Sequence, residues 1–368
     1  MLRCAPREEL PRAARVFSGR EPPPGLRAGE ALRGAGATCM APPQRGERRG
    51  NDAEHRRNVG TRRGAARAAE QPLLCFPAME DPRDTSWFRS HPLAFADVGT
   101  AEIAYRRIGS GPPLLMLHGW PFSSLSYRAL ARRLSERFTC ILPDTPGLGE
   151  TRWREDTPFA FADQVATLRA FVDRLDLPGY GLVGHDTGGT LARLLALGDR
   201  ERAGRVVVMN SEMPGHRPPW IPLYQRLAAL PFTATSFGWL LRLGAYRRSS
   251  LAYGPCFDDP RRLDADFHAC FVAPLLASRR RVEGVMRYLR GIDWRLVDGL
   301  AERHRALTQG VLLVWGARDT VFPVAHARAM VEQFRGAARL IEVPDARFLV
   351  HEERPALVAE AITNFLGA

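Results

Sequence analysis

The segment that most constrains this chain is residues 184–188, with the sequence GHDTG, in which glycines flank a turn that carries one acidic side chain. The apolar residues 180–183 before it predict a short strand, and the leucine- and alanine-rich residues 190–197 after it predict a helix. A strand that turns sharply into a helix exposes the side chain at the tip of the turn, which here is Asp186. A carboxylate at this tip determines which chemistry the rest of the sequence can support.

The chain from Ala101 onward alternates short apolar segments with helical patterns. Strands are predicted at residues 101–109, 114–117, 139–142, 180–183, 205–209, 311–315 and 338–343. Helices are predicted at residues 126–137, 161–175, about 326–334 and 355–365. Strands that are apolar on both faces and alternate with helices predict an α/β fold with a mostly parallel sheet covered by helices on both faces.

Residues 211–305 interrupt this alternation with proline-rich turns, helical patches and many aromatic residues. We interpret the segment as a helical cap inserted over the carboxyl ends of the strands, where open α/β sheets bind their ligands. The cap divides the core into a first part, residues 86–210, and a second part, residues 306–368.

The first 80 residues are rich in Arg, Pro, Ala and Gly and show little apolar periodicity. Residues 1–78 contain 15 Arg and 8 acidic residues, a charge of +7 out of +12 for the whole chain. Such a composition predicts a disordered extension, with the folded protein beginning near Met79. Aromatic residues are nearly absent from it, so a nucleic-acid partner is not expected.

The six cysteines show no C-x-x-C pair and no metal-ligand spacing. We therefore expect reduced thiols in a cytoplasmic protein, with no metal or organic cofactor. No apolar run reaches the length of a membrane span, so no membrane partner is expected.

Five short motifs occur in order, each at the end of a predicted strand. They are HGWP at residues 118–121, D-x-x-G-x-G at 144–149, GHDTGG at 184–189, WGARD at 315–319 and FLVH at 348–351. With these motifs, the chain from about Ser86 to Ala368 resembles an α/β-hydrolase, of the branch with an aspartate nucleophile that contains epoxide hydrolases and haloalkane dehalogenases.

The resemblance implies a catalytic triad in the chain order of this fold. Asp186 would be the nucleophile, which attacks a saturated carbon and becomes an ester. His351 would activate the water that hydrolyses this ester, and Asp319 would orient His351. Glu212 is the alternative acid, and a helix-capping or turn role is the structural alternative for the two aspartates.

The resemblance also implies an oxyanion hole made by the backbone N–H groups of Trp120 and Thr187. The Trp120–Pro121 peptide bond is expected to be cis, as in similar motifs. Three further polar residues are expected to hold loops rather than to react, namely His118, His185 and Asp144.

The substrate is less constrained than the nucleophile. Thr187 stands where both epoxide hydrolases and dehalogenases usually have a tryptophan, whereas epoxide hydrolases also use two cap tyrosines as proton donors. Tyr288 is one candidate donor, and the other is Tyr253, with Tyr224 and Tyr246 left open. We therefore favour hydrolysis of a small apolar epoxide by water to give a diol.

Two alternatives are kept. The first is hydrolytic dehalogenation of a haloalkane, and the second is a non-catalytic binding protein on a hydrolase scaffold. The oligomeric state does not follow from the sequence.

Overall fold

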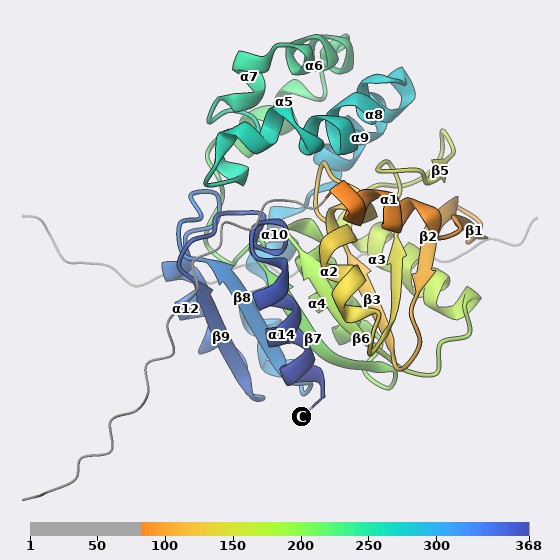
Figure 1. Cartoon of the computed structure of the whole chain (residues 1–368), viewed down its shortest axis with the longest axis vertical. Helices are drawn as coiled ribbons and strands as arrows, with labels where there is room; N and C mark the ends of the chain where they lie inside the picture. Colours follow the sequence, from red (N-terminus) through yellow and green to blue (C-terminus); the bar gives the residue numbers. More distant parts are fainter. Residues whose placement is uncertain (1–81, 368) are drawn as a thin grey trace, which may run out of the picture. The chain divides into compact units, whose positions relative to one another are not determined.

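The computed structural model describes residues 82–367, and the strands in this range form one nine-stranded sheet (Figure 1). The expected N-terminal extension, residues 1–80, lies outside the described residues. The strands are β1 (Ala94–Asp97), β2 (Ala101–Ile108), β3 (Pro113–Leu117), β4 (Thr139–Pro143), β5 (Arg152–Trp153), β6 (Tyr180–His185), β7 (Ala203–Met209), β8 (Val311–Gly316) and β9 (Ala338–Val343).

The sheet is parallel from β4 to β9 and antiparallel only at one end. Its order is β1-β2-β4-β3-β6-β7-β8-β9, and β5 pairs with β2 outside this path. Antiparallel pairing is confined to β1, β2 and β5 and to the contact of β2 with β4. The prediction of a mostly parallel α/β sheet is thus confirmed.

Helices cover both faces of the sheet. The core helices are α1 (Pro82–Ser90), η1 (Ser124–Tyr127), α2 (Arg128–Leu134), α3 (Phe161–Arg174), α4 (Thr187–Gly198), α12 (Val324–Val331), α13 (Val350–Glu353) and α14 (Pro355–Leu366). In Figure 1, α1, α2 and α14 lie in front of the strands, and α3 and α4 lie behind them. The sequence predicted every strand except β1 and β5, which are short and lie toward the antiparallel end.

Strand register places the reactive positions together. The central strands β4, β7 and β8 are rich in valine, isoleucine and leucine residues that are buried, which favours their pairing within the sheet. Leu117 of β3 pairs with Gly184 of β6, and His185 pairs with Met209 of β7. The residues that follow these strands therefore lie next to one another at the carboxyl edge of the sheet.

The segment between β7 and β8 is described throughout and contains helices and no strand. Its elements are α5 (Trp220–Leu227), α6 (Thr233–Arg242), α7 (Gly244–Arg248), η2 (Gly254–Cys256), η3 (Pro260–Asp264), η4 (His268–Val272), α8 (Ala273–Leu276), α9 (Arg279–Gly291), α10 (Trp294–Asp298), α11 (Leu300–Arg303) and η5 (His304–Ala306). Figure 1 shows α5 to α9 gathered in a layer apart from the sheet. Among the described residues, no helix has the length and apolar character needed to cross a membrane.

Candidate active site

The turn between β6 and α4 holds Asp186 in a strained conformation. Its backbone angles are φ 53° and ψ −131°, a combination that residues other than glycine rarely adopt. Such a conformation costs about 1–3 kcal/mol and persists only where the surroundings enforce it. Its N–H donates to the carbonyl oxygens of Met209 and Asn210 at 3.2 and 3.1 Å. At Gly188, a Cβ atom would lie 2.0 Å from the carbonyl oxygen of Leu117, so only glycine fits there.

Backbone N–H groups favour the ionised carboxylate of Asp186. The N–H of Trp120 donates to Oδ2 at 2.8 Å, and the N–H of the adjacent Thr187 also acts to lower the pKa of this carboxyl. The Trp120–Pro121 bond is cis, which confirms that prediction. A Cβ atom on Gly119 would lie 2.4 Å from Cβ of Asp186, so the loop before Trp120 approaches the aspartate as closely as a backbone can.

A pocket of about 90 Å³ opens above this carboxylate. A buried water occupies only about 10–15 Å³ of such a cavity, so the pocket has room for a small organic molecule together with water. From the core, the residues that line it include Trp120, Phe122, Asp186, Thr187, Glu212, Val321, Phe322 and Phe348. From the cap, they include Trp220, Tyr224, Phe237, Leu241, Tyr246, Tyr253, Cys256 and Trp294. The wall is apolar apart from two carboxyl groups, a few hydroxyl groups and a thiol.

Burial raises the pKa of Asp186 well above its usual value, and the nearby carboxyl of Glu212 raises it further. Burial also raises the pKa of Glu212, although Thr190 Oγ1 donates to its Oε2 at 2.7 Å and Ser211 Oγ donates at 3.3 Å. The site therefore contains a pair of carboxyl groups that do not both ionise easily.

A buried cation lies behind this pair. Arg193 of α4 is fully buried and donates to the carbonyl oxygen of Glu212 at 2.7 Å and to Ser211 Oγ at 3.0 Å. Its charge favours the ionised form of Glu212. Burial lowers the pKa of Arg193 to about 10, so it remains charged at neutral pH. Arg193 was not among the residues predicted from the sequence, because its role depends on its burial behind Glu212.

Asp319 is anchored by three donors. Asn210 Nδ2 donates to Oδ2 at 2.7 Å, and the N–H groups of Val321 and Phe322 donate to Oδ1 at 2.7 and 3.1 Å. Burial raises the pKa of Asp319 to about 7. Asp319 is therefore held by Asn210 and by its own turn, whose residues Val321 and Phe322 line the pocket.

The structure does not bring His351 to the nucleophile. Its imidazole is fully buried. The centroid of this ring lies 4.9 Å from that of the Tyr127 ring and 4.5 Å from that of the His185 ring. Within residues 82–367, neither ring nitrogen has a hydrogen-bond partner, so the bond expected with Asp319 is not formed. Burial lowers the pKa of His351 well below its usual value, and His351 is not part of the pocket wall. The predicted triad is thus not assembled through His351.

Phe348 is the residue of this turn that lines the pocket, in the same wall as Asp186. Its carbonyl oxygen bonds His185 Nε2 at 2.9 Å, and its ring centroid is 5.9 Å from that of Phe322. Because His351 comes three residues later, at the second position of α13, its side chain turns into the core instead. No pattern in the sequence distinguishes these two positions.

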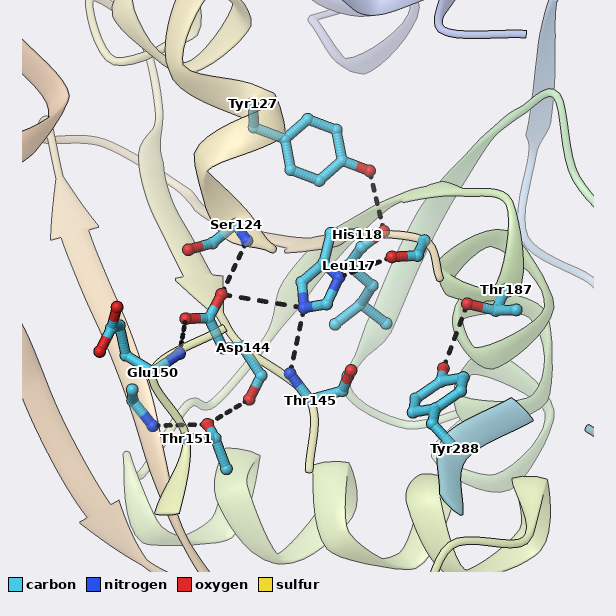
Figure 2. A network of polar contacts seen from close by, with 12 residues as sticks. Leu117, His118, Ser124, Tyr127, Asp144, Thr145, Glu150, Thr151, Thr187 and Tyr288 are labelled. Atoms are coloured by element: carbon cyan, nitrogen blue, oxygen red, sulfur yellow. Dashed lines mark hydrogen bonds and ion pairs between the residues drawn. The ribbon is translucent and has the colours of Figure 1, made fainter. Parts of the chain in front are cut away.

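The two candidate cap tyrosines have different environments. The hydroxyl of Tyr288 on α9 donates to Thr187 Oγ1 at 3.1 Å, and Tyr288 is fully buried outside the pocket wall (Figure 2). Tyr253 lines the pocket itself. Burial raises the pKa of both phenols, so each keeps its proton at neutral pH.

The loops around the site are held by the residues that the sequence assigned to this role. Figure 2 shows Asp144 accepting from the N–H groups of Ser124 and Glu150, and the imidazole of His118 accepting from the N–H of Thr145. The distances are 2.7, 2.8 and 3.1 Å. These bonds fix the loop that follows β4 beside the one that contains Trp120.

Comparison with known proteins places the chain in a family. The family described as alpha/beta hydrolase fold matches residues 112–355. Haloalkane dehalogenase 2 of Mycobacterium tuberculosis is 27% identical over 78% of this chain and 96% of its own length. The magnesium-chelatase 30 kDa subunit of Rhodobacter capsulatus is 32% identical over 66% of this chain and 82% of its own length. The structure of epoxide hydrolase CorEH, 22% identical, superposes with a TM-score of 0.64 over 75% of this chain and 98% of its own.

Proposed function

The chain is a hydrolase of the α/β-hydrolase fold family, and on that premise we propose that Asp186 attacks a small apolar electrophile and forms an alkyl ester. The observation that carries the proposal is the position of the Asp186 carboxylate at the floor of an apolar pocket. Its Oδ2 is held by the N–H of Trp120, which leaves Oδ1 for attack on a saturated carbon. The pocket requires no charged group on the substrate.

An epoxide suits this pocket better than an alkyl halide. Opening an epoxide creates an alkoxide that needs a proton, and the phenol of Tyr253 lies in the pocket wall to supply it. A departing halide needs a fixed N–H donor instead. The indole N–H groups of Trp120 and Trp294 already donate to Val285 O and Gln225 Oε1, at 2.9 and 3.0 Å.

The second half of the reaction needs a base that reaches the ester. Water attacks Cγ of the esterified Asp186, a general base takes the water proton, and negative charge develops on the oxygen held by Trp120 and Thr187. The intermediate then expels the alkoxide of the product, which takes the proton back from the base. Asp186 is left as a carboxylic acid, which returns the second water proton to the Tyr253 phenolate. Epoxide plus water thus gives the diol, and both side chains are restored.

We infer that Glu212 is this base. Glu212 lies in the same pocket wall as Asp186, and its Oε2 is fixed by the hydroxyls of Thr190 and Ser211. Esterification removes the charge of Asp186, so the buried cation Arg193 then favours an ionised Glu212 at the step that requires a base. His351 has no such access to the pocket.

The experiment is intact-mass spectrometry of the protein after mixing with a panel of alkyl epoxides and 1-haloalkanes, together with assays for diol and halide. Transient gain of one epoxide mass followed by diol formation supports the proposal. Asp186→Asn should show neither, because Asn tolerates a positive φ but is not a nucleophile. Glu136→Gln, an exposed residue remote from the pocket, is the control for changing one carboxyl. Reversible binding with no adduct and no product in any substrate class would reject the proposal in favour of a non-catalytic binding protein.

A further inference from the structure

Large apolar side chains are exposed on the cap in unusual number. Leu223, Leu227, Leu230, Phe232, Trp239 and Leu243 are between 41% and 79% exposed, with Phe232 the most exposed. They belong to α5, α6 and the connection between these helices. We call these six residues, together with Arg226 and Arg242, the cap patch. Figure 1 shows that α6 lies in the outer part of the cap, away from the sheet. An apolar surface of this kind marks a binding site.

Each helix presents its apolar residues and one arginine on the same face. On α5, Leu223, Arg226 and Leu227 follow the spacing of one helical face. On α6, Trp239 and Arg242 follow the same spacing, and Leu243 comes directly after the helix ends. Helices with leucine and tryptophan beside arginine on their exposed side are typical of binding at a membrane surface.

The charge around the cap patch has one sign. Residues 213–257 contain five arginines and no Asp, Glu or Lys. Arg226 and Arg242 form no ion pair within the described part of the chain, whereas Arg247 and Arg248 share Asp264. A partner that covers this surface should therefore be both apolar and negatively charged.

The cap patch adjoins a second cavity, of about 290 Å³. Leu227 and Leu230 line this cavity, and so do Trp120, Tyr224 and Tyr246, which also line the pocket above Asp186. The cap patch therefore borders a cavity that shares wall residues with the pocket above Asp186.

We propose that the cap patch docks onto the surface of an anionic phospholipid bilayer. Phe232 and Trp239 enter the boundary between headgroups and acyl chains, and Arg226 and Arg242 bind the anionic headgroups. This contact is peripheral and requires no membrane-spanning helix. It does not depend on the proposed chemistry at Asp186, although an apolar substrate dissolved in the bilayer could reach the pocket through the adjoining cavity.

Flotation of the full chain with vesicles tests the proposal. We expect recovery with vesicles of phosphatidylserine and phosphatidylcholine, weak recovery with phosphatidylcholine alone, and release by salt. Arg226→Gln and Arg242→Gln should each weaken binding by about five-fold. Phe232→Ser with Trp239→Ser should abolish flotation. Arg200→Gln and Leu357→Ser, which change exposed residues on the core, are the matched controls and should change nothing.

Two results would overturn the proposal. If the full chain floats equally well with all cap variants, the arginine-rich residues 1–78 or another surface binds the lipid. The second result is a dimer without lipid binding. If neither the unmodified chain nor any variant floats, and the chain forms dimers that the Phe232→Ser, Trp239→Ser variant disrupts, the cap patch is an interface between two copies. Circular dichroism of each variant shows that the fold is retained.

Discussion

The backbone N–H of Trp120 bonds Oδ2 of Asp186 at 2.8 Å, so the donor expected to bind an oxyanion already holds an oxygen of the nucleophile. This relationship follows from the residue at the tip of the turn. When an aspartate is esterified, the tetrahedral intermediate forms at its own Cγ, and the oxyanion is one of its own oxygens. A donor placed at Oδ2 is therefore in position for the hydrolytic step without any movement of the loop.

Asp186→Asn should abolish ester formation and lower diol production by roughly 10⁴-fold or more, because the amide is not a nucleophile. In the unmodified chain, adduct formation should speed up with rising pH, since attack needs the ionised carboxylate and burial raises the pKa of Asp186. Rapid-quench mass spectrometry at several pH values measures both effects. Adduct formation that slows as pH rises would contradict the assignment.

Glu212→Gln should let the ester form and then slow its hydrolysis by about 10²–10⁴-fold, because the base is lost while the oxyanion donors remain. One epoxide mass should stay on the protein. His351→Gln should leave the ester short-lived, since the imidazole does not reach the pocket. The opposite pattern, with a stable ester only in His351→Gln, would restore the histidine as base, and a stable ester in the unmodified chain would exclude both residues.

Tyr253→Phe should slow epoxide opening by about 10²-fold and leave attack on alkyl halides unchanged, because only the alkoxide needs a proton. Tyr288→Phe should have a smaller effect, since its hydroxyl is bonded to Thr187 Oγ1 outside the pocket wall. Rates of adduct formation with matched epoxide and bromide chains provide the comparison. Equal slowing of both substrates by Tyr253→Phe would indicate a packing role.

The parts of the fold that the sequence predicted are those set by local pattern. Each of these patterns spans only about ten residues, so it predicts its element without knowledge of the rest of the fold. Examples are the apolar runs of β6, β7 and β8 and the glycine-flanked turn at Asp186. The neighbourhood of Trp120 and Asp186 was also predictable, since both follow parallel strands that end at the same edge of the sheet.

The assignment of the base failed for a different reason. Whether Phe348 or His351 faces the pocket depends on how the turn after β9 passes into α13, and three residues of turn and helix decide the direction of each side chain. No periodicity specifies such a direction. The countercharge Arg193 was missed because its role arises from burial behind Glu212, which only tertiary packing reveals.

Replacing His351 with Leu should change how stability depends on pH. Burial lowers the pKa of His351 well below 6.5, so the unfolded chain binds a proton below that pH while the folded chain does not. The unmodified protein therefore loses stability as pH falls below 6.5, and His351 contributes to that loss because only the unfolded chain protonates it. Urea unfolding of both proteins across this range measures it. A constant difference between them would show that His351 binds its proton equally well in the folded and the unfolded chain.

Phe348→His should supply a new base to a pocket whose Glu212 has been replaced by Gln. Phe348 lines the pocket with Asp186, and its ring lies 5.9 Å from that of Phe322, whose N–H bonds Asp319. An imidazole at this position would face the ester and lie near a carboxylate that could orient it. Combined with Glu212→Gln, the substitution should therefore restore hydrolysis of the stranded ester, by about 10-fold or more. Phe348→Leu in the same background is the control for enlarging the pocket. The decay of the adduct mass after removal of free epoxide gives the rate, and equal decay in the histidine and leucine variants would show that residue 348 does not approach the ester carbon.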